Sequence, residues 1–298
     1  MPIFGIDVSK NNGNLNFAAI RSSGVRFVMV KASQGHTLYS RDGYLFEDSR
    51  FALNVEGFHS VGIPVGAYHF FTASTLNEAY READFFLKTV EPYRDRIDLY
   101  LACDAEVYDN PYIDKLSRAE LTSLIDAFCR RVEAAGYHVC HYTNTDHIKN
   151  RIDLSRLDFP VWQARYIENG QTSRPAEAGD KLAIHQYTGS GQLPGVVGEF
   201  DHNFGYAPLS RLIIKSRTTI EDKTFDYIER YKTGDNILAR LADMIVARDI
   251  KPLTAPTRER IVPLLRLKCR LTPDETAYLN SYKWAEELFF KLYTAMLV

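Results

Sequence analysis

Eight short apolar runs recur along the first two thirds of the sequence, and they constrain the fold more than any other feature. They cover residues 2–9, 25–32, 63–71, 99–107, 139–142, 160–166, 182–187 and 198–203. Strands that are apolar on both faces are typical of a parallel sheet covered by helices. Eight such strands predict an α/β fold in which the sheet closes into a barrel.

Amphipathic segments between the early runs predict the covering helices. We expect helices at residues 16–22, 46–60, 76–90 and 117–135. The last of these begins with Ser117 and Glu120, whose spacing fits a capping box. After Tyr142 the strands continue while helical segments become rare, so the helices are expected to cover the barrel unevenly.

The fourth run ends in two carboxylic acids, Asp104 and Glu106. Residues two apart in a strand point to the same face, so these acids repel each other, while Cys103 and Ala105 point toward a packed helix. The less solvated acid is expected to stay protonated near neutral pH beside an ionised partner. Such a pair suits general acid catalysis.

Nearly every other run also delivers a polar side chain at or near the carboxyl end of its strand. The set comprises Asp7, Lys31, His69, Asp104, Glu106, Tyr142, Trp162, Gln186 and Asp201. The carboxyl ends of the strands hold the active site in a parallel barrel. The sequence therefore predicts a catalytic site that contains four acids.

Glycoside hydrolysis is the chemistry that fits these residues best, because it needs two carboxyl groups, one neutral and one ionised. Flat aromatic faces for sugar rings are available from Tyr68, Phe70, Tyr142, Trp162, Tyr166 and Tyr187. Core packing is the better interpretation for Phe70, Phe71 and Phe200, and also for His69 and His185. A tyrosine or tryptophan with a polar tip at a strand end is a better site candidate.

Other chemistries find less support. Acids alone could hold Mg²⁺ or Ca²⁺, but the sequence has no EF-hand spacing, no HExxH and no Gly-rich phosphate loop. It also lacks the GxSxG motif of serine hydrolases. The four cysteines, at positions 103, 129, 140 and 269, form no CxxC pair. We therefore expect no metal, no cofactor and no disulfide framework, only free and mostly buried thiols.

The charge distribution excludes some partners. The net charge of −2 provides no global field for nucleic acid or for a membrane surface. The charge is uneven, since residues from Ala207 onward carry a net +4 and the preceding part a net −6. We expect no signal peptide of the usual kind and no transmembrane helix.

Several short motifs in this order resemble glycoside hydrolase family 25, the lysozymes or N-acetylmuramidases of the Chalaropsis type. They are Gly5-Ile6-Asp7-Val8-Ser9, Phe27-Val28-Met29-Val30-Lys31-Ala32-Ser33, Gly66-Ala67-Tyr68-His69-Phe70, Asp104-Ala105-Glu106, Trp162-Gln163-Ala164-Arg165-Tyr166, His185-Gln186-Tyr187-Thr188 and the segment from Gly195 to Asn203. The resemblance covers residues from about Gly5 to Tyr206.

The resemblance implies an irregular TIM-like β/α barrel, with fewer helices than strands, over residues 1–206. It implies retaining cleavage of the β-1,4 bond from N-acetylmuramic acid to N-acetylglucosamine in peptidoglycan. By motif, Glu106 is the general acid/base, Asp104 its partner acid, and Asp7 and Asp201 the other site acids. Around them we expect substrate contacts from Tyr68, Tyr142, Trp162, Tyr166, Gln186 and Lys31.

The second participant in the reaction is either an enzyme carboxylate or the 2-acetamido group of the substrate. Asp104 lies two residues before Glu106 on the same strand face, which suits it to orient an acetamide, so we favour substrate assistance. Two departures from the family stand out. Gln34 occupies a position where the family often has Glu, and the loop from His36 to Phe46 is a few residues long.

Residues 207–298 are expected to form a helical module of unknown role, outside the resemblance. Thr272, Pro273 and Glu275 give a strong helix start, and apolar residues then follow at helical spacing through Tyr278, Tyr282, Ala285, Phe289, Leu292 and Met296. A carrier or an immunity protein could bind this module. A wall enzyme without a signal peptide is expected to be made in the cytoplasm and to reach the wall or periplasm by phage lysis or specialised secretion.

Two alternatives to a lysozyme stay open from the sequence. One is a non-catalytic barrel that keeps the groove and binds glycans. The other is a chitin-type hydrolase on the same fold. Retention of both Asp104 and Glu106 favours catalysis over binding alone.

Overall fold

The computed structural model describes residues 2–35, 45–106, 111–166 and 173–297, so the loop that we expect to be long, residues 36–46, lies mostly outside the described residues. The chain divides into two compact units. One unit is Phe4–Phe204, and the other comprises the residues from Gly205 onward together with the first residues of the chain.

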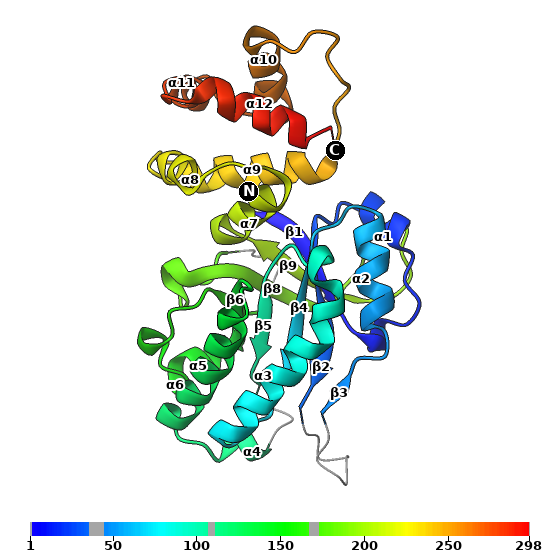
Figure 1. The fold of residues 1–298 in the computed structure, drawn as a ribbon, viewed down its shortest axis with the longest axis vertical. Coiled ribbons are helices and arrows are strands. Elements are labelled where there is room, and N and C mark those ends of the chain that lie inside the picture. The colour runs from blue at the N-terminus through cyan, green and yellow to red at the C-terminus, as the bar shows by residue number, and fades with distance from the viewer. Residues whose placement is uncertain (1, 36–44, 107–110, 167–172, 298) are drawn as a thin grey trace. The chain divides into compact units, whose positions relative to one another are not determined.

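The larger unit is an eight-stranded barrel (Figure 1). Its strands are β1 (Ile3–Val8), β2 (Phe27–Gln34), β4 (Val65–Phe70), β5 (Leu101–Asp104), β6 (Val139–Asn144), β7 (Val161–Ala164), β8 (Leu182–Gly191) and β9 (Phe200–Gly205). They follow the order β1-β9-β8-β7-β6-β5-β4-β2, and β2 pairs with β1 to close the sheet. The prediction of an eight-strand α/β barrel is confirmed.

The following neighbouring strands of the barrel pair in parallel: β1 with β2, β2 with β4, β4 with β5, β5 with β6, β6 with β7, and β7 with β8. The register sets Asp104 opposite Phe70 on one side and opposite Tyr142 on the other. A short strand, β3 (Phe46–Glu47), pairs antiparallel with the end of β2. We expected helix at these two residues, but the helix begins later because Phe46 and Glu47 pair with Ser33 and Gln34.

Helices cover the outside of the barrel. They are α1 (Phe17–Ser22), α2 (Phe51–Ser60), α3 (Leu76–Val90), α4 (Pro111–Asp114), α5 (Arg118–Ala134) and α6 (Thr145–Asn150). The predicted capping box is present at the start of α5, where Ser117 and Glu120 bond each other's backbone N–H groups. The short helix α6 follows Tyr142, in the part of the chain that we expected to be poor in helices.

The core lies between the strands and these helices, and β5 shows how alternation builds it. Leu101, Cys103 and Ala105 are inaccessible and belong to the same hydrophobic cluster as Phe128 and Cys129 of α5. Asp104 points to the opposite side, as a two-residue period requires. The four cysteines are free and buried, as the sequence predicts.

The smaller unit is helical. Its helices are α7 (Ala207–Arg217), α8 (Asp222–Glu229), α9 (Gly234–Ala247), α10 (Arg258–Lys268), α11 (Pro273–Asn280) and α12 (Ala285–Ala295). We expected the apolar spacing from Tyr278 to Met296 to form one helix, but the structure breaks it between Asn280 and Ala285. Pro263 lies inside α10.

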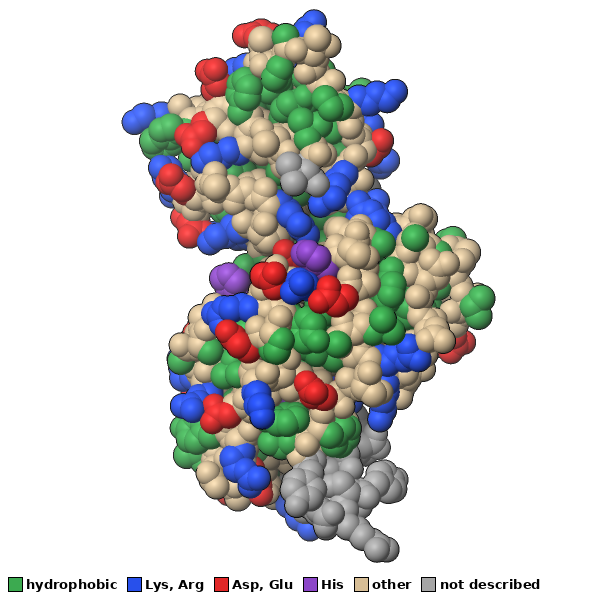
Figure 2. Space-filling view, turned by 45° about the vertical axis from the view of Figure 1, so that its right-hand side comes forward, with side chains coloured by type: hydrophobic (Ala, Val, Ile, Leu, Met, Phe, Trp, Pro, Cys, Tyr) green, Lys and Arg blue, Asp and Glu red, His purple; other side chains and the backbone are tan. Residues whose placement is uncertain are grey.

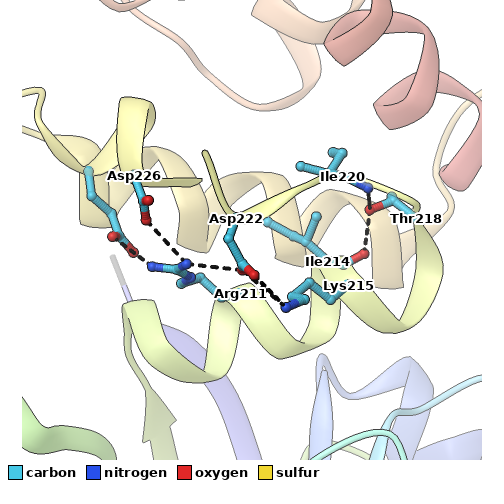
Figure 3. A network of polar contacts seen from close by, with 8 residues as sticks. Arg211, Ile214, Lys215, Thr218, Ile220, Asp222 and Asp226 are labelled. Atoms are coloured by element: carbon cyan, nitrogen blue, oxygen red, sulfur yellow. Dashed lines mark hydrogen bonds and ion pairs between the residues drawn. The ribbon is translucent and has the colours of Figure 1, made fainter. Parts of the chain in front are cut away.

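Ion pairs fix α7 to α8 (Figure 3). The guanidinium of Arg211 contacts Asp222, Asp226 and Glu229, and the Lys215 ammonium also contacts Asp222. The turn between the helices is held by Thr218, whose hydroxyl donates to the Ile214 carbonyl and accepts the N–H of Ile220.

Charges of both signs are interspersed on one face of the molecule. On the face shown in Figure 2, Lys and Arg side chains lie among Asp and Glu side chains and do not gather into one block. Within the described ranges, no helix combines the length and the hydropathy that crossing a membrane requires.

Candidate active site

Asp104 and Glu106 form the centre of the candidate site. Asp104 is the last residue of β5 and is 6% exposed, whereas Glu106, two residues later, is half-buried. Burial raises the pKa of Asp104 well above its usual range, and the charge of Glu106 and a hydrogen bond with it raise it further. Asp104 is thus the less solvated acid of the pair, and it favours the protonated form.

Lys31 of β2 interacts electrostatically with Asp104. The charge of Lys31 lowers the pKa of Asp104, and burial lowers the pKa of Lys31 itself. The Lys31 Nζ atom donates to Oε1 of Gln34 at 2.9 Å and lies 4.9 Å from the ring centroid of Phe70. Gln34 thus accepts a hydrogen bond from the cation whose charge acts on Asp104.

Asp7 of β1 anchors a buried hydrogen-bond network. Its Oδ2 atom accepts the side-chain amides of Gln186 at 2.9 Å and of Asn203 at 2.7 Å. Burial, followed by the charge of Asp201, raises the pKa of Asp7 well above its usual range, while the two amides oppose the shift. Asp7 is 5% exposed, so its contacts are with this network and hardly with solvent.

Asp201 joins the cluster from a different position than we expected. It is the second residue of β9, near the start of the strand and not at its carboxyl end. Burial raises the pKa of Asp201 to about 6, and a hydrogen bond with Asp7 opposes this rise. A Cβ added to Gly189 of β8 would lie 3.2 Å from Asp201 and 2.9 Å from the Tyr166 hydroxyl, so a glycine leaves room for both.

The aromatic candidates divide by exposure. Tyr166 is 58% exposed, whereas Tyr68 and Tyr142 are 9% and 7% exposed. The hydroxyls of Tyr142 and Tyr166 both donate to Oε1 of Gln186, at 2.9 and 3.3 Å. Tyr166 is therefore the accessible ring of the three, while Tyr68 and Tyr142 are nearly covered.

Trp162 does not fit its expected place against the substrate. Only 1% of it is exposed, and its ring packs edge-on against Tyr68 and Tyr142. Its indole N–H donates to Oδ1 of Asn203 at 2.8 Å. Because neighbouring side chains cover it, Trp162 supports the site from the core and does not face the solvent.

The histidines are core residues, as we interpreted them. His69 is inaccessible and bonds Ser33 through Nδ1 and Glu82 through Nε2, at 2.8 and 3.0 Å. His185 is also inaccessible, and its Nε2 atom donates to the Arg165 carbonyl. Phe71 and Phe200 are buried too.

Asn203 is the site residue that we missed as a functional candidate. It is inaccessible and links Trp162 to Asp7. Its position two residues after Asp201 in the same strand was the available signal, because such residues share a face. Among the described residues, no group of three or more His, Cys, Asp or Glu side chains is arranged to hold a metal ion.

Comparison with known proteins agrees with this geometry. The sequence model of the family described as glycosyl hydrolases family 25 matches residues 6–196. The match covers most of the chain and all the site acids except Asp201. The chain therefore belongs to glycosyl hydrolases family 25, and the predicted family is confirmed. It is a member of a family of glycoside hydrolases.

Named relatives come from several bacteria. The autolytic lysozyme of Clostridium acetobutylicum is 29% identical over 66% of this chain and 54% of its own length. Lysozyme M1 of Streptomyces globisporus is 26% identical over 72% of this chain and 71% of its own length. The spore cortex lytic enzyme SleM of Clostridium perfringens has a TM-score of 0.56 at 26% identity, covering 68% of this chain and 67% of that one. The match spans about half the length of the first of these relatives.

Proposed function

We propose that the chain hydrolyses the β-1,4 bond between N-acetylmuramic acid and N-acetylglucosamine in peptidoglycan. The observation that carries the proposal is the hydrogen-bonded pair of Asp104 and Glu106 inside a cluster of four acids. The names of the relatives, two of them lysozymes, support peptidoglycan as the substrate. Such a substrate lies in the cell wall, so the wall is the proposed site of action.

We assign the general acid/base role to Glu106, because it is the more exposed acid of the pair. In this role Glu106 protonates the glycosidic oxygen as the bond to the sugar carbon breaks, and later accepts a proton from the water that attacks. The charge of Lys31 opposes the rise in the pKa of Asp104 only in part, so Asp104 favours the proton in the free site. A substrate N–H donated to Asp104 would favour its ionised form, and the shared proton would then be on Glu106.

Asp104 is proposed to orient the 2-acetamido group of the substrate. Its Oδ1 atom is buried and has no hydrogen-bond partner within the described residues. A buried carboxylate oxygen without a donor is costly, so a substrate N–H is a favourable partner. The acetamide oxygen would then attack the sugar carbon as the leaving oxygen departs, and water would open the resulting ring with overall retention. Competitive inhibition by a thiazoline analogue of this intermediate tests the step.

Tyr166 is proposed as the principal sugar-stacking residue, with Tyr68, Tyr142, Gln186 and Lys31 lining the groove. Trp162 is retained as a supporting residue. Asp7 and Asp201 are proposed to complete the site electrostatically, since each shares charge or a hydrogen bond with its neighbours in the cluster.

The deciding experiment is digestion of purified peptidoglycan, followed by mass spectrometry of the new reducing ends. Glu106→Gln is the test variant, and Glu133→Gln, an exposed position on α5, is the matched control. New muramic-acid ends that Glu106→Gln loses and Glu133→Gln keeps would support the proposal. New glucosamine ends would show that a different glycosidic bond is cleaved, which would favour a chitin-type hydrolase. No new ends from folded protein on several wall types would favour a glycan-binding barrel.

We also propose a division of roles along the chain. Catalysis is assigned to residues 1–206, and residues 207–298 are the part that would contact a carrier or an immunity protein. Limited proteolysis of the full chain, with lytic activity measured on the separated fragments, tests the first. Activity confined to a fragment from the second part of the chain would contradict it.

A further inference from the structure

The helical unit contains an internal repeat. Its first three helices begin at Ala207, Asp222 and Gly234, and its last three at Arg258, Pro273 and Ala285. Each helix of the second set thus begins 51 residues after its counterpart. The sequence follows the same spacing, because Tyr227-Ile228 and Tyr231-Lys232 correspond to Tyr278-Leu279 and Tyr282-Lys283. α7–α9 and α10–α12 are therefore two copies of one three-helix motif.

The two copies contact each other reciprocally. The rings of Tyr227 and Tyr278, which are equivalent, stack at 4.5 Å and 13°. The Tyr227 hydroxyl donates to the Tyr278 carbonyl at 2.8 Å, and the Tyr278 hydroxyl donates to the Tyr227 carbonyl at 2.6 Å. Tyr227 meets Tyr282 in the same geometry as Tyr278 meets Tyr231, 4.5 Å and 32° in each case. Such contacts define a pseudo-twofold relationship, as in an isologous dimer.

In one half of this arrangement a carboxylate is held in place. Glu275 is 4% exposed and receives three donors: the Thr272 backbone N–H at 2.8 Å, the Thr233 hydroxyl at 2.7 Å and Nη2 of Arg240 at 2.7 Å. The other arm of the Arg240 guanidinium donates to the Arg270 carbonyl at 2.8 Å. This is a complete carboxylate-binding site whose occupant is part of the chain.

In the other half the equivalent carboxylate is missing. The position of Glu275 is taken by Thr224, that of Thr233 by Trp284 and that of Arg240 by Lys291. Lys291 keeps the role of Arg240, since its Nζ atom donates to the carbonyl of Thr219, the counterpart of Arg270, at 3.0 Å. Thr224 carries no carboxylate, and its hydroxyl lies within hydrogen-bond distance of the Tyr282 hydroxyl, at 2.9 Å. The helix start at α8 has no side-chain cap.

A pocket lies where the carboxylate is missing. It is shallow and partly open to solvent, and Thr224, Trp284, Leu288 and Lys291 line it together with the acids Glu221 and Glu287. Trp284 is 40% exposed and gives the pocket a flat apolar wall. The pocket therefore combines a cation and an aromatic ring beside a helix start that no side chain caps.

We propose that this pocket binds a carboxylate supplied by a ligand, in the position that Glu275 occupies in the other half. The ligand is a sugar or a short peptide that carries the carboxylate and rests against Trp284. In peptidoglycan a free carboxylate is present on the peptide stem, and on muramic acid wherever the stem has been removed. This identification of the source rests on the proposed function.

The charges around the pocket are compatible with this ligand. Glu287 pairs with Lys291 one helical turn away, and Glu221 pairs with Lys223, whose ammonium lies 4.5 Å from the Trp284 ring centroid. Both glutamates are more than half exposed in their side chains, and exposed pairs of this kind are weak. A ligand carboxylate can therefore replace Glu287 at Lys291, which still has donors to offer.

The experiment titrates the full chain with small probes and follows the Trp284 indole N–H signal by nuclear magnetic resonance. The chain has two tryptophans, so Trp284→Phe assigns the signal. N-acetylmuramic acid and N-acetyl-D-alanyl-D-alanine are the carboxylate probes. N-acetylglucosamine and the dipeptide amide are their neutral counterparts.

A saturable shift with either acid, and a much weaker one with its neutral counterpart, supports the proposal and identifies a sugar or a peptide as the source. No shift with either acid, or equal shifts with the neutral probes, would overturn it. Cleavage of peptidoglycan is measured separately. Absence of binding at the pocket would therefore leave the proposed hydrolase function intact, and absence of cleavage would not exclude binding at the pocket.

Three variants sharpen the test. Thr224→Glu supplies the missing carboxylate from the chain and should abolish binding, while Lys291→Met should weaken it at least about tenfold. Glu287→Gln removes the competing acid and should tighten binding about two- to fivefold. Lys232→Met, at an exposed lysine in the other copy, is the matched control and should change nothing. Unchanged binding in folded Thr224→Glu and in Lys291→Met would overturn the proposal.

Discussion

The side-chain amide of Asn203 donates to Oδ2 of Asp7 at 2.7 Å, although 196 residues separate the two in the sequence. The carbonyl of the same amide accepts the indole N–H of Trp162 at 2.8 Å. One buried side chain therefore connects the aromatic floor of the site to one of its acids. Each of its bonds lies in a region closed to water, where loss of a partner is costly.

Trp162→Phe should lower the free energy of unfolding by about 1–3 kcal/mol, because it leaves the Asn203 carbonyl oxygen without its buried donor. KM for glycan fragments should stay nearly constant, since the ring is covered. Chemical denaturation and steady-state kinetics measure the two quantities. A large rise in KM at unchanged stability would mean that Trp162 contacts the substrate.

Tyr166→Ala should show the opposite pattern. The ring is 58% exposed, so its loss should change stability little but remove a stacking face worth about 1–2 kcal/mol, or roughly five- to thirtyfold in KM. Tyr166→Phe is the control, because it keeps the ring and loses only the 3.3 Å bond to Gln186. Equal KM values for the alanine variant and the wild type would exclude stacking on Tyr166.

Asp201→Asn should stabilise the protein at pH 7 and have little effect near pH 4. The pKa of Asp201 is raised to about 6 from a usual value of 3.8, so ionisation costs stability that is lost as pH rises from about 4 through 6. Removing the charge should recover on the order of 1–2 kcal/mol at pH 7, allowing for partial solvent screening. Denaturation curves at both pH values check this.

Asp158→Asn is the control for that experiment, because the side chain of Asp158 is 79% exposed. Its effect on stability should be small at both pH values. If Asp201→Asn stabilises the protein equally at pH 4 and pH 7, the gain does not come from removing the buried charge of Asp201.

Glu82→Ala should be strongly destabilising, by about 3–5 kcal/mol, because it removes the acceptor of a buried cluster. The Glu82 carboxylate binds Nε2 of His69 and both the N–H and the hydroxyl of Thr72. Glu82→Gln keeps the shape and one oxygen acceptor, so it should cost clearly less. Thermal unfolding of the two variants measures the difference, and equal losses would show that packing, not hydrogen bonding, accounts for the role of Glu82.

The parts of the fold that depend on local chemistry could be predicted from the sequence. The run that becomes β5 is apolar until it reaches Asp104, and the capping boxes at Ser117 and Thr272 are present as expected. These features need only neighbouring residues to form. The break between α11 and α12 could not be predicted in this way, because the apolar spacing continues across it without Gly or Pro.

The site was only partly predictable for a related reason. Asp104 and Glu106 share a strand face by periodicity alone, so their pairing followed from the sequence. Which aromatic ring is covered depends on residues from several strands, and the sequence gives no sign that Trp162 lies beneath Tyr68 and Tyr142. The role of Asn203 likewise depends on closure of the barrel.

Closure of the barrel also has a consequence for synthesis on the ribosome. Strand β1 is made first, yet one of its two neighbours is β9, the last strand of the barrel. Asp7 cannot receive the Asn203 amide until that strand has left the exit tunnel. Long-range pairings of this kind form late in folding. A nascent chain that has not reached Asn203 therefore lacks one wall of the site, and the complete arrangement of acids arises only after the whole barrel has been translated.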